Sequence, residues 1–131
     1  MVPTLLLTLY LLPCAVQDWR THRVSNWLTV PAFGAAWVAA LTFGHLPLTV
    51  AVFGGCYGAW RLGWMGAADG KLATLLAAVA PPALACSGLL LGVTFLLLRL
   101  RADPNRHLPA AAWFCAGSLL HLLYLLLVRF P

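Results

Sequence analysis

Charged residues are scarce in this sequence, and acidic ones are the scarcest. They make up 8% of the 131 residues, and only Asp18, Asp69 and Asp103 are acidic. A soluble domain carries about 25% charged residues, whereas 63% of this chain is hydrophobic. The composition therefore excludes an ordinary soluble domain and predicts an all-α integral membrane protein.

The sequence also lacks the patterns typical of metal sites and of nucleic-acid-binding domains. Its four cysteines stand singly in apolar stretches, without a Cys-x-x-Cys pair or a Cys/His cluster, so we expect no metal site. The formal net charge is +5, but the basic residues lie in the gaps between apolar runs, as they do in membrane proteins. We therefore expect no nucleic acid and no cofactor as a partner.

Six apolar runs follow one another with short gaps between them. They cover approximately residues 2–16, 27–44, 46–61, 70–81, 83–99 and 109–128. About 20 helical residues span a hydrocarbon core of about 30 Å, so the length suits a single polytopic domain, residues 1–131. We predict six transmembrane helices joined by short loops. Five helices are the alternative, because the break at Pro81-Pro82 can also be a kink within one helix.

The basic residues predict the orientation of these helices. Seven of the eight Lys and Arg residues fall in alternate gaps, with two after the first run, two around the gap after the third and three after the fifth. Loops rich in Lys and Arg stay in the cytoplasm. We therefore predict a multi-pass protein of the cytoplasmic (inner) membrane with both termini outside, which places Asp18 and Asp69 on the cytoplasmic face.

Asp18 and Asp69 are the candidate catalytic residues. Each stands at the mouth of an apolar run with basic residues nearby, and an ionisable group in such a setting suggests a functional site. Two neighbouring carboxylates cannot both ionise cheaply, so one keeps a proton while the other activates water. Which of the two is the base stays open. The alternative is that each Asp caps a helix or pairs with a neighbouring Arg or Lys.

Three segments resemble the signatures of the type IV prepilin peptidase family, in order and over essentially the whole chain. They are residues 18–29 (DWRTHRVSNWLT), 66–72 (GAADGKL) and 106–110 (RHLPA). The first resembles an Asp at a helix end, followed by a basic loop and an Ile-Pro-Asn-like step into a new helix. The second is similar to a Gly-x-Gly-Asp sequence followed by Lys-Leu, and the third to a short Pro-containing segment that opens the last helix.

The resemblance implies a membrane aspartyl endopeptidase that uses Asp18 and Asp69 and no cofactor. Its expected partners are membrane lipids and pilin-like precursor proteins, whose short basic leader it removes at the cytoplasmic membrane face. The chain has no room for the cysteine-rich insert of larger bacterial members. It therefore resembles the compact members of Flp/Tad-type or archaeal systems, and we expect no methylation activity. The precursor and the oligomeric state stay open.

Two positions depart from the pattern of this family. Ala68 stands where the family usually has Gly, and Ser25 stands where it usually has Pro. If position 68 needs a positive φ, Ala costs about 1 kcal/mol; if Gly only allows close helix approach, Ala is nearly as good. Ser25 is expected to loosen the start of the second helix.

Several other residues are candidates for supporting roles. Asn26 is expected either to bond backbone near Asp18 or to cap the second helix. Lys71 is expected either to position a carboxylate or to lie at the membrane interface without a specific function. Gly66 belongs to the second signature. A small-residue face on the third run is expected to pack against another helix; it consists of Gly54, Gly55 and Gly58.

Two other functions fit the same composition. One is a catalytically inactive, divergent family member that acts as a pilus or secretion assembly subunit, and the other is a small proton-coupled membrane transporter. The predicted placement of both carboxylates on one face argues against a transport path, which would need groups through the bilayer.

Overall fold

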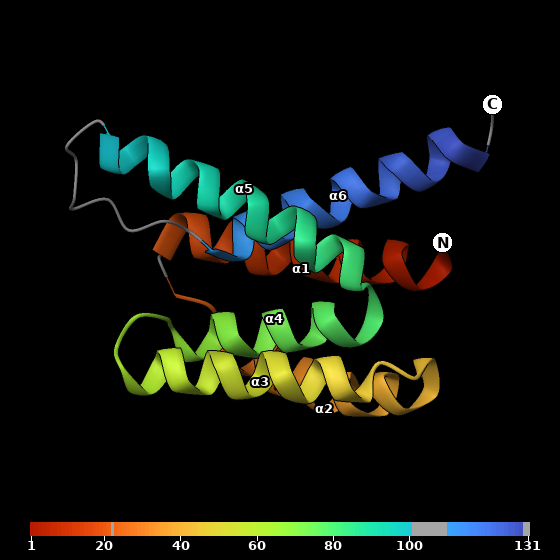
Figure 1. Cartoon of the computed structure of the whole chain (residues 1–131), viewed down its shortest axis with the longest axis horizontal. Coiled ribbons are helices and arrows are strands. Elements are labelled where there is room, and N and C mark those ends of the chain that lie inside the picture. The colour runs from red at the N-terminus through yellow and green to blue at the C-terminus, as the bar shows by residue number, and fades with distance from the viewer. Residues whose placement is uncertain (22, 101–109, 130–131) are drawn as a thin grey trace.

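Six α-helices run up and down along the chain (Figure 1). The structure is a computed structural model that describes residues 1–21, 23–100 and 110–129, with side chains described up to residue 97 in the fifth helix. The helices are α1 (Val2–Thr21), α2 (Asn26–Phe43), α3 (Leu46–Arg61), α4 (Ala67–Val79), α5 (Pro81–Leu100) and α6 (Ala110–Arg129). The described residues contain no strand, which confirms the predicted all-α fold.

The break between the fourth and fifth helices is a turn, so the five-helix alternative is wrong. Helix α4 ends at Val79 and α5 begins at Pro81. Ala80 between them has φ −147° and ψ 74°, because a residue before proline is disfavoured in the helical conformation. Pro81 itself starts α5, where its missing N–H costs nothing.

Three of the described helices are long and apolar enough to cross a membrane, namely α1, α2 and α6. Helix α5 contributes a shorter apolar stretch, Pro81–Leu97. Helices α3 and α4 have 16 and 13 residues, which is less than the roughly 20 that a full span needs. The chain is thus a membrane protein, and the crossing of the bilayer by all six helices stays a prediction.

Helix α4, the shortest of the six, lies inside the bundle. Figure 1 shows it between α2 and α3 on one side and α5 and α6 on the other. It packs mainly against α2 and α3 and also touches α1, α5 and α6, and every residue from Leu72 to Ala78 is buried. The part of α4 that follows its first turn is therefore held by neighbours on several sides.

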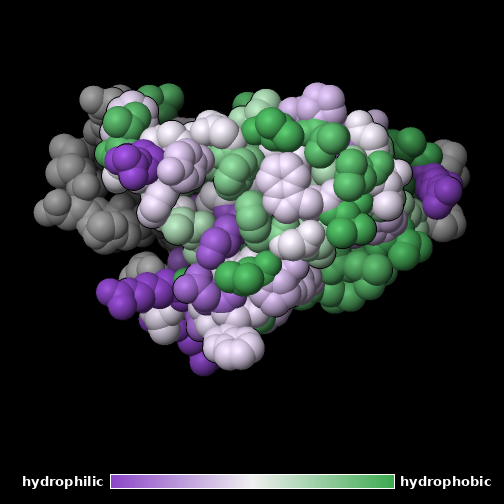
Figure 2. Space-filling view, turned by 90° about the horizontal axis from the view of Figure 1, so that it is seen from below, coloured by the Kyte–Doolittle hydropathy of each residue, from purple (hydrophilic) through white to green (hydrophobic). Residues whose placement is uncertain are grey.

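The alternating helix directions bring both chain ends to one end of the bundle (Figure 1). There Arg129 lies 3.8 Å from the sulfur of Met1. The opposite end holds the end of α1, the start of α4 and the start of α6. Most of the hydrophilic side chains visible in Figure 2 gather at that opposite end. The fold thus collects there the described parts of all three segments that the sequence singled out.

Small residues allow two close helix contacts, but at other positions than predicted. A Cβ at Gly117 of α6 would lie 2.7 Å from the Cα of Ser87 in α5, and one at Gly70 of α4 would lie 3.2 Å from Cβ of Cys56 in α3. By contrast, a Cβ at Gly54, Gly55 or Gly58 would meet no atom within 4 Å. The predicted packing face on the third helix is therefore wrong, because those positions point away from the other helices of this chain.

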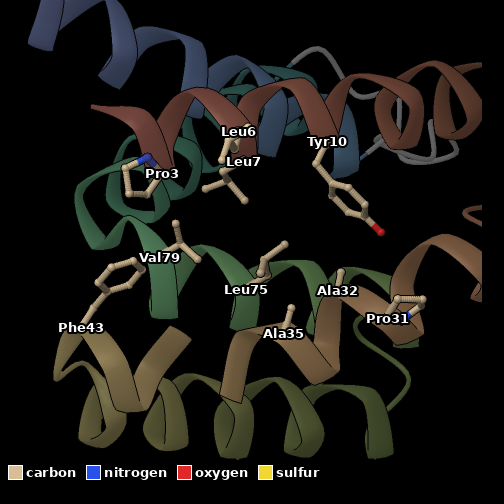
Figure 3. A pocket seen from close by; sticks show the side chains of 10 residues that line it. All are labelled: Pro3, Leu6, Leu7, Tyr10, Pro31, Ala32, Ala35, Phe43, Leu75 and Val79. Atoms are coloured by element: carbon tan, nitrogen blue, oxygen red, sulfur yellow. The ribbon is translucent and has the colours of Figure 1, made fainter. Parts of the chain in front are cut away.

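An apolar hollow of about 390 Å³ separates α1 from α2 and α4 (Figure 3). Leu7 of α1, Ala32 of α2 and Leu75 of α4 are among its walls. Tyr10 reaches across from α1, and its hydroxyl donates a hydrogen bond to the carbonyl of Leu28 in α2. Helix α1 is therefore tied to α2 by a polar contact at one end of the hollow, while its main helix neighbour is α6.

Candidate active site

Asp18 lies in the last turn of α1, at the helix end that the resemblance implies. Its side chain is only 7% exposed. One carboxylate oxygen, Oδ2, accepts a hydrogen bond of 2.9 Å from the backbone N–H of Ala111, in the first turn of α6. The first N–H groups of a helix have no partner within that helix. Asp18 therefore satisfies one of these groups from a different part of the chain.

Asp69 lies in the first turn of α4, three residues after the N-cap Gly66. Its carboxylate accepts a hydrogen bond from the backbone of Gly66, which is the arrangement of an acidic residue at the third position of a capping box. Each Asp therefore bonds backbone N–H at the start of a helix, as the alternative interpretation of the sequence expects. Capping by itself gives no reason for the two acids to lie near each other.

The two carboxylates are close enough to interact electrostatically. Burial is the main cause that raises the pKa of Asp69 to about 6, and the charge of Asp18 is the second. The hydrogen bond from Gly66 acts in the opposite direction but is weaker. A carboxyl group with this pKa keeps its proton well above the usual range near 4. Asp69 can therefore carry a proton at a mildly acidic pH at which an ordinary aspartate is ionised.

Asp69 forms part of the wall of a cleft of about 840 Å³ between the helices. The segment before α4 contributes Gly66, α5 contributes Gly88 and Gly92, and α6 contributes Ala110. Ala110 precedes Ala111, whose N–H bonds Asp18. The cleft therefore extends from the Asp69 carboxylate toward the start of α6, where Asp18 is bonded. Its lining also includes large apolar side chains, among them Leu91 and Phe95 of α5.

Comparison with known families agrees with this geometry. The model of the type IV leader peptidase family matches residues 5–129, nearly the whole chain. The chain belongs to the type IV leader peptidase family. This confirms the resemblance found in the sequence. No curated protein and no solved structure matches the chain.

The two departures from the leader peptidase signatures are mild in this structure. Ala68 lies within the first turn of α4, where the backbone is helical, so no positive φ is required there and alanine carries no such cost. Ser25 is the N-cap of α2, and its hydroxyl accepts a hydrogen bond of 3.3 Å from the N–H of Trp27. The expectation that Ser25 loosens this helix start is wrong, because serine is a favoured N-cap.

Asn26 and Lys71 bond each other rather than the partners expected from the sequence. The ammonium of Lys71 donates a hydrogen bond of 3.1 Å to the side-chain oxygen of Asn26. Ser25 rather than Asn26 caps α2. Within the described part of the chain, the Asn26 side chain bonds Lys71 and no backbone near Asp18. The pair ties the start of α2 to the start of α4, next to the candidate site.

Gly66 has the clearest supporting role of the three candidates. Its φ of −72° and ψ of 147° suit any residue, so backbone strain is not the reason for glycine. A Cβ at this position would lie 2.9 Å from Oδ2 of Asp69. Glycine at position 66 leaves the space that the Asp69 carboxylate occupies.

Sequence reasoning missed two groups that shape the site. The side-chain oxygen of Gln17 accepts a hydrogen bond of 3.0 Å from the N–H of Ser25, which fixes the turn from α1 into α2. The N–H of Ala111 holds Asp18; only the position of the third signature, just before the last helix, pointed to it. Residues 106–109 of that signature, and Asp103, lie outside the described residues.

The described residues offer no grouping of three or more His, Cys, Asp or Glu side chains that could hold a metal ion. Cys14 and Cys115 are buried, and Cys56 and Cys86 are partly buried; all four are free. The chemistry that the described site itself can offer is that of two carboxyl groups, one of which, Asp69, borders a cleft.

Proposed function

We propose that this leader peptidase family member is a membrane aspartyl endopeptidase that removes the short basic leader from type IV pilin-like precursors. The observation that supports the proposal is that Asp18, in the last turn of α1, and Asp69, in the first turn of α4, lie at the same end of the bundle. The charge of one raises the pKa of the other, and Asp69 borders a cleft. Precursors of Flp/Tad-type or archaeal systems are the proposed substrates, since all four cysteines lie within helices and no cysteine-rich insert separates two of them.

The proposed reaction is hydrolysis of a peptide bond by an activated water molecule. One carboxylate takes a proton from water while the oxygen of that water attacks the scissile carbonyl carbon. The other carboxyl group, which carries the shared proton, passes it to the carbonyl oxygen, and a tetrahedral diol forms. The first group then protonates the leaving nitrogen, the C–N bond breaks, and the second group recovers its proton. The sum is one water consumed, one acid and one amine formed.

The charge distribution supports a site that faces the cytoplasm. Arg20 and Arg61 lie in the last turns of α1 and α3, and Lys71 lies in the first turns of α4. All three are at the end of the bundle that holds Asp18 and Asp69. Basic residues favour the cytoplasmic side, so this end is proposed to meet the cytoplasm, where water and a polar leader are available.

Co-expression with a candidate pilin precursor tests the proposal. Asp18→Asn and Asp69→Asn keep the size of each side chain but remove its ionisation, so each is expected to abolish leader removal, seen on a gel as a precursor that stays full length. Asp103→Asn is the matched control, because it changes the remaining acid of the chain, and its cleavage is expected to match the wild type. All three variants must reach the membrane in similar amount.

The same experiment separates the other functions. An assembly subunit without catalysis would leave the precursor uncut in the wild type as well, and pilus assembly would tolerate both Asp→Asn changes. A proton-coupled transporter would lose flux in the variants while the precursor was processed equally in all of them. Either pattern would overturn the peptidase proposal.

A further inference from the structure

We infer that an aromatic pocket beside Asp69 receives a large apolar side chain from the part of the precursor that follows the cut, while the basic leader lies in the cleft that Asp69 borders. The inference rests on the proposed peptidase function. It adds the residues that select the substrate and the direction in which the substrate chain crosses the site. The aromatic pocket is formed by Phe33 of α2, by Phe53, Tyr57 and Trp60 of α3, and by the start of α4.

The size and the walls of the aromatic pocket suit one large side chain. The pocket has a volume of about 250 Å³, whereas sites for drug-sized ligands have about 300–1,000 Å³. Its rings form one row: the ring centroids of Phe33 and Phe53 are 5.5 Å apart, those of Phe53 and Tyr57 6.2 Å, and those of Tyr57 and Trp60 5.6 Å. Aromatic walls of this kind favour an apolar or aromatic group.

The aromatic pocket begins next to the candidate site, because Gly66 belongs to both. Gly66 lines the pocket and also the cleft that Asp69 borders, and a Cβ on it would lie 2.9 Å from Oδ2 of Asp69. Two further small residues of α4, Ala67 and Gly70, line the pocket. A peptide that crosses at Gly66 with its scissile bond at Asp69 therefore has the cleft on one side of the cut and the aromatic pocket on the other.

Positive charge at the aromatic pocket disfavours the basic leader there. Lys71 lines the pocket, and its ammonium is bonded to the neutral side chain of Asn26, so this bond does not cancel its charge. Arg61 directly follows Trp60 in the last turn of α3. Aromatic rings attract cations, but the two cations already present repel a third. The pocket therefore suits an uncharged side chain of the precursor, which we place after the cut.

The cleft on the other side of Gly66 suits the leader better. It borders Asp69 and extends toward the start of α6, where Asp18 is bonded. A segment that carries positive charge is electrostatically complementary to a hollow with acidic groups. The leader is therefore placed between α4 and α5, and the part of the precursor that follows the cut is placed over α3.

An exchange of side-chain size between enzyme and substrate tests the aromatic pocket. Ala67→Leu puts a larger side chain into its wall, at the first residue of α4, where leucine is compatible with a helix. Precursors with Ala, Leu or Phe at single positions near the cut are compared by kcat/KM. At one of the first positions after the cut, the wild type should prefer Leu or Phe to Ala by about 10- to 100-fold. Ala67→Leu should lose or reverse this preference.

Ala35→Leu is the matched control. It makes the same change in the wall of the apolar hollow between α1, α2 and α4, away from the aromatic pocket, so it should keep the preference of the wild type. Four results would overturn the inference: no such preference in the wild type, an unchanged preference in Ala67→Leu, the same loss in Ala35→Leu, and a responsive position that lies in the leader. An unchanged preference would mean that another molecule, such as a lipid chain, fills the pocket.

Failure of the inference and failure of the proposed function give different results. In each of the four cases the wild type still removes the leader and Asp69→Asn does not, so the peptidase would stand without this subsite. A wild type that leaves every precursor uncut would contradict the proposed function itself.

Photocrosslinking tests the direction of the substrate even if the pocket variant does not fold. Precursors carry p-benzoylphenylalanine at single positions on either side of the cut, and Asp69→Asn enzyme is used so that they stay intact. A probe after the cut should crosslink to α3 between Phe53 and Trp60, and a probe in the leader should crosslink to α5, whose Leu91 and Phe95 line the cleft. The reverse pattern, or no crosslink to α3 from any position after the cut, would overturn the inference.

Discussion

At position 66 the absence of a side chain leaves room for a carboxylate. The backbone of Gly66 has an ordinary extended conformation, so alanine would fit the chain itself without strain. What alanine would not fit is Oδ2 of Asp69, only 2.9 Å from the site of its Cβ. Alanine at position 66 would therefore make the Asp69 carboxylate shift, and the effect of that shift on cleavage can be tested apart from folding.

Gly66→Ala is expected to lower leader cleavage by on the order of 10- to 100-fold, because a catalytic group displaced by about 1 Å loses its alignment. The measurement is the initial rate of precursor cleavage in detergent. Gly54→Ala is the control: its Cβ meets no atom within 4 Å, and alanine favours the helix by about 0.5–1 kcal/mol. Its rate should equal that of the wild type. Equal rates in both variants would contradict the role given to Gly66.

At this residue scale the sequence located the acids but not their partners. Asp18 and Asp69 stood out because the chain contains only three acidic residues. The role of the Ala111 N–H could not be predicted from the sequence, because every non-proline residue has the same backbone donor. Asn26 and Lys71 were candidates for supporting roles, but their bond to each other joins α2 to α4. A contact between distant segments cannot be predicted from either segment alone.

At the scale of helices, apolar runs predicted the number and order of elements, but not all their ends. The first run ended at residue 16 in the sequence, whereas α1 continues to Thr21. The fourth was expected to begin at residue 70, whereas α4 begins at Ala67. Polar residues can continue a helix where neighbouring groups satisfy their hydrogen bonds, and a hydropathy pattern does not show where this happens. Both carboxylates consequently lie inside helices and not in loops.

Helix number also determines the sidedness of the chain ends. If all six helices cross the membrane, a reporter fused after Pro131 lies outside, so alkaline phosphatase there should be active and green fluorescent protein dark. The same reporters fused after Leu62, between α3 and α4, should give the reverse result. Fluorescence from both fusions would contradict six crossings, because three crossing helices, α4 to α6, would put the two fusion points on opposite sides.

At the scale of the whole molecule, the order of packing creates the site. Helix α4 is inserted between two helix groups, and its buried face from Leu72 to Ala78 leaves it little freedom to slide. The end of α1 and the starts of α4 and α6 therefore meet at one end of the bundle (Figure 1). The sequence predicted that the two acids share a face of the membrane. Their meeting depends on packing between helices that periodicity does not describe.

The central claim is that Asp18 and Asp69 form one site, and carboxyl NMR tests it most directly. The chain has three acidic side chains, so ¹³C labelling of aspartate gives three side-chain signals to titrate. In the wild type the pKa of Asp69 should be about 6. In Asp18→Asn it should fall, because one cause of its rise is gone, but stay above the ordinary 3.8, because burial remains the larger cause. An Asp69 titration that did not change in Asp18→Asn would contradict the claim.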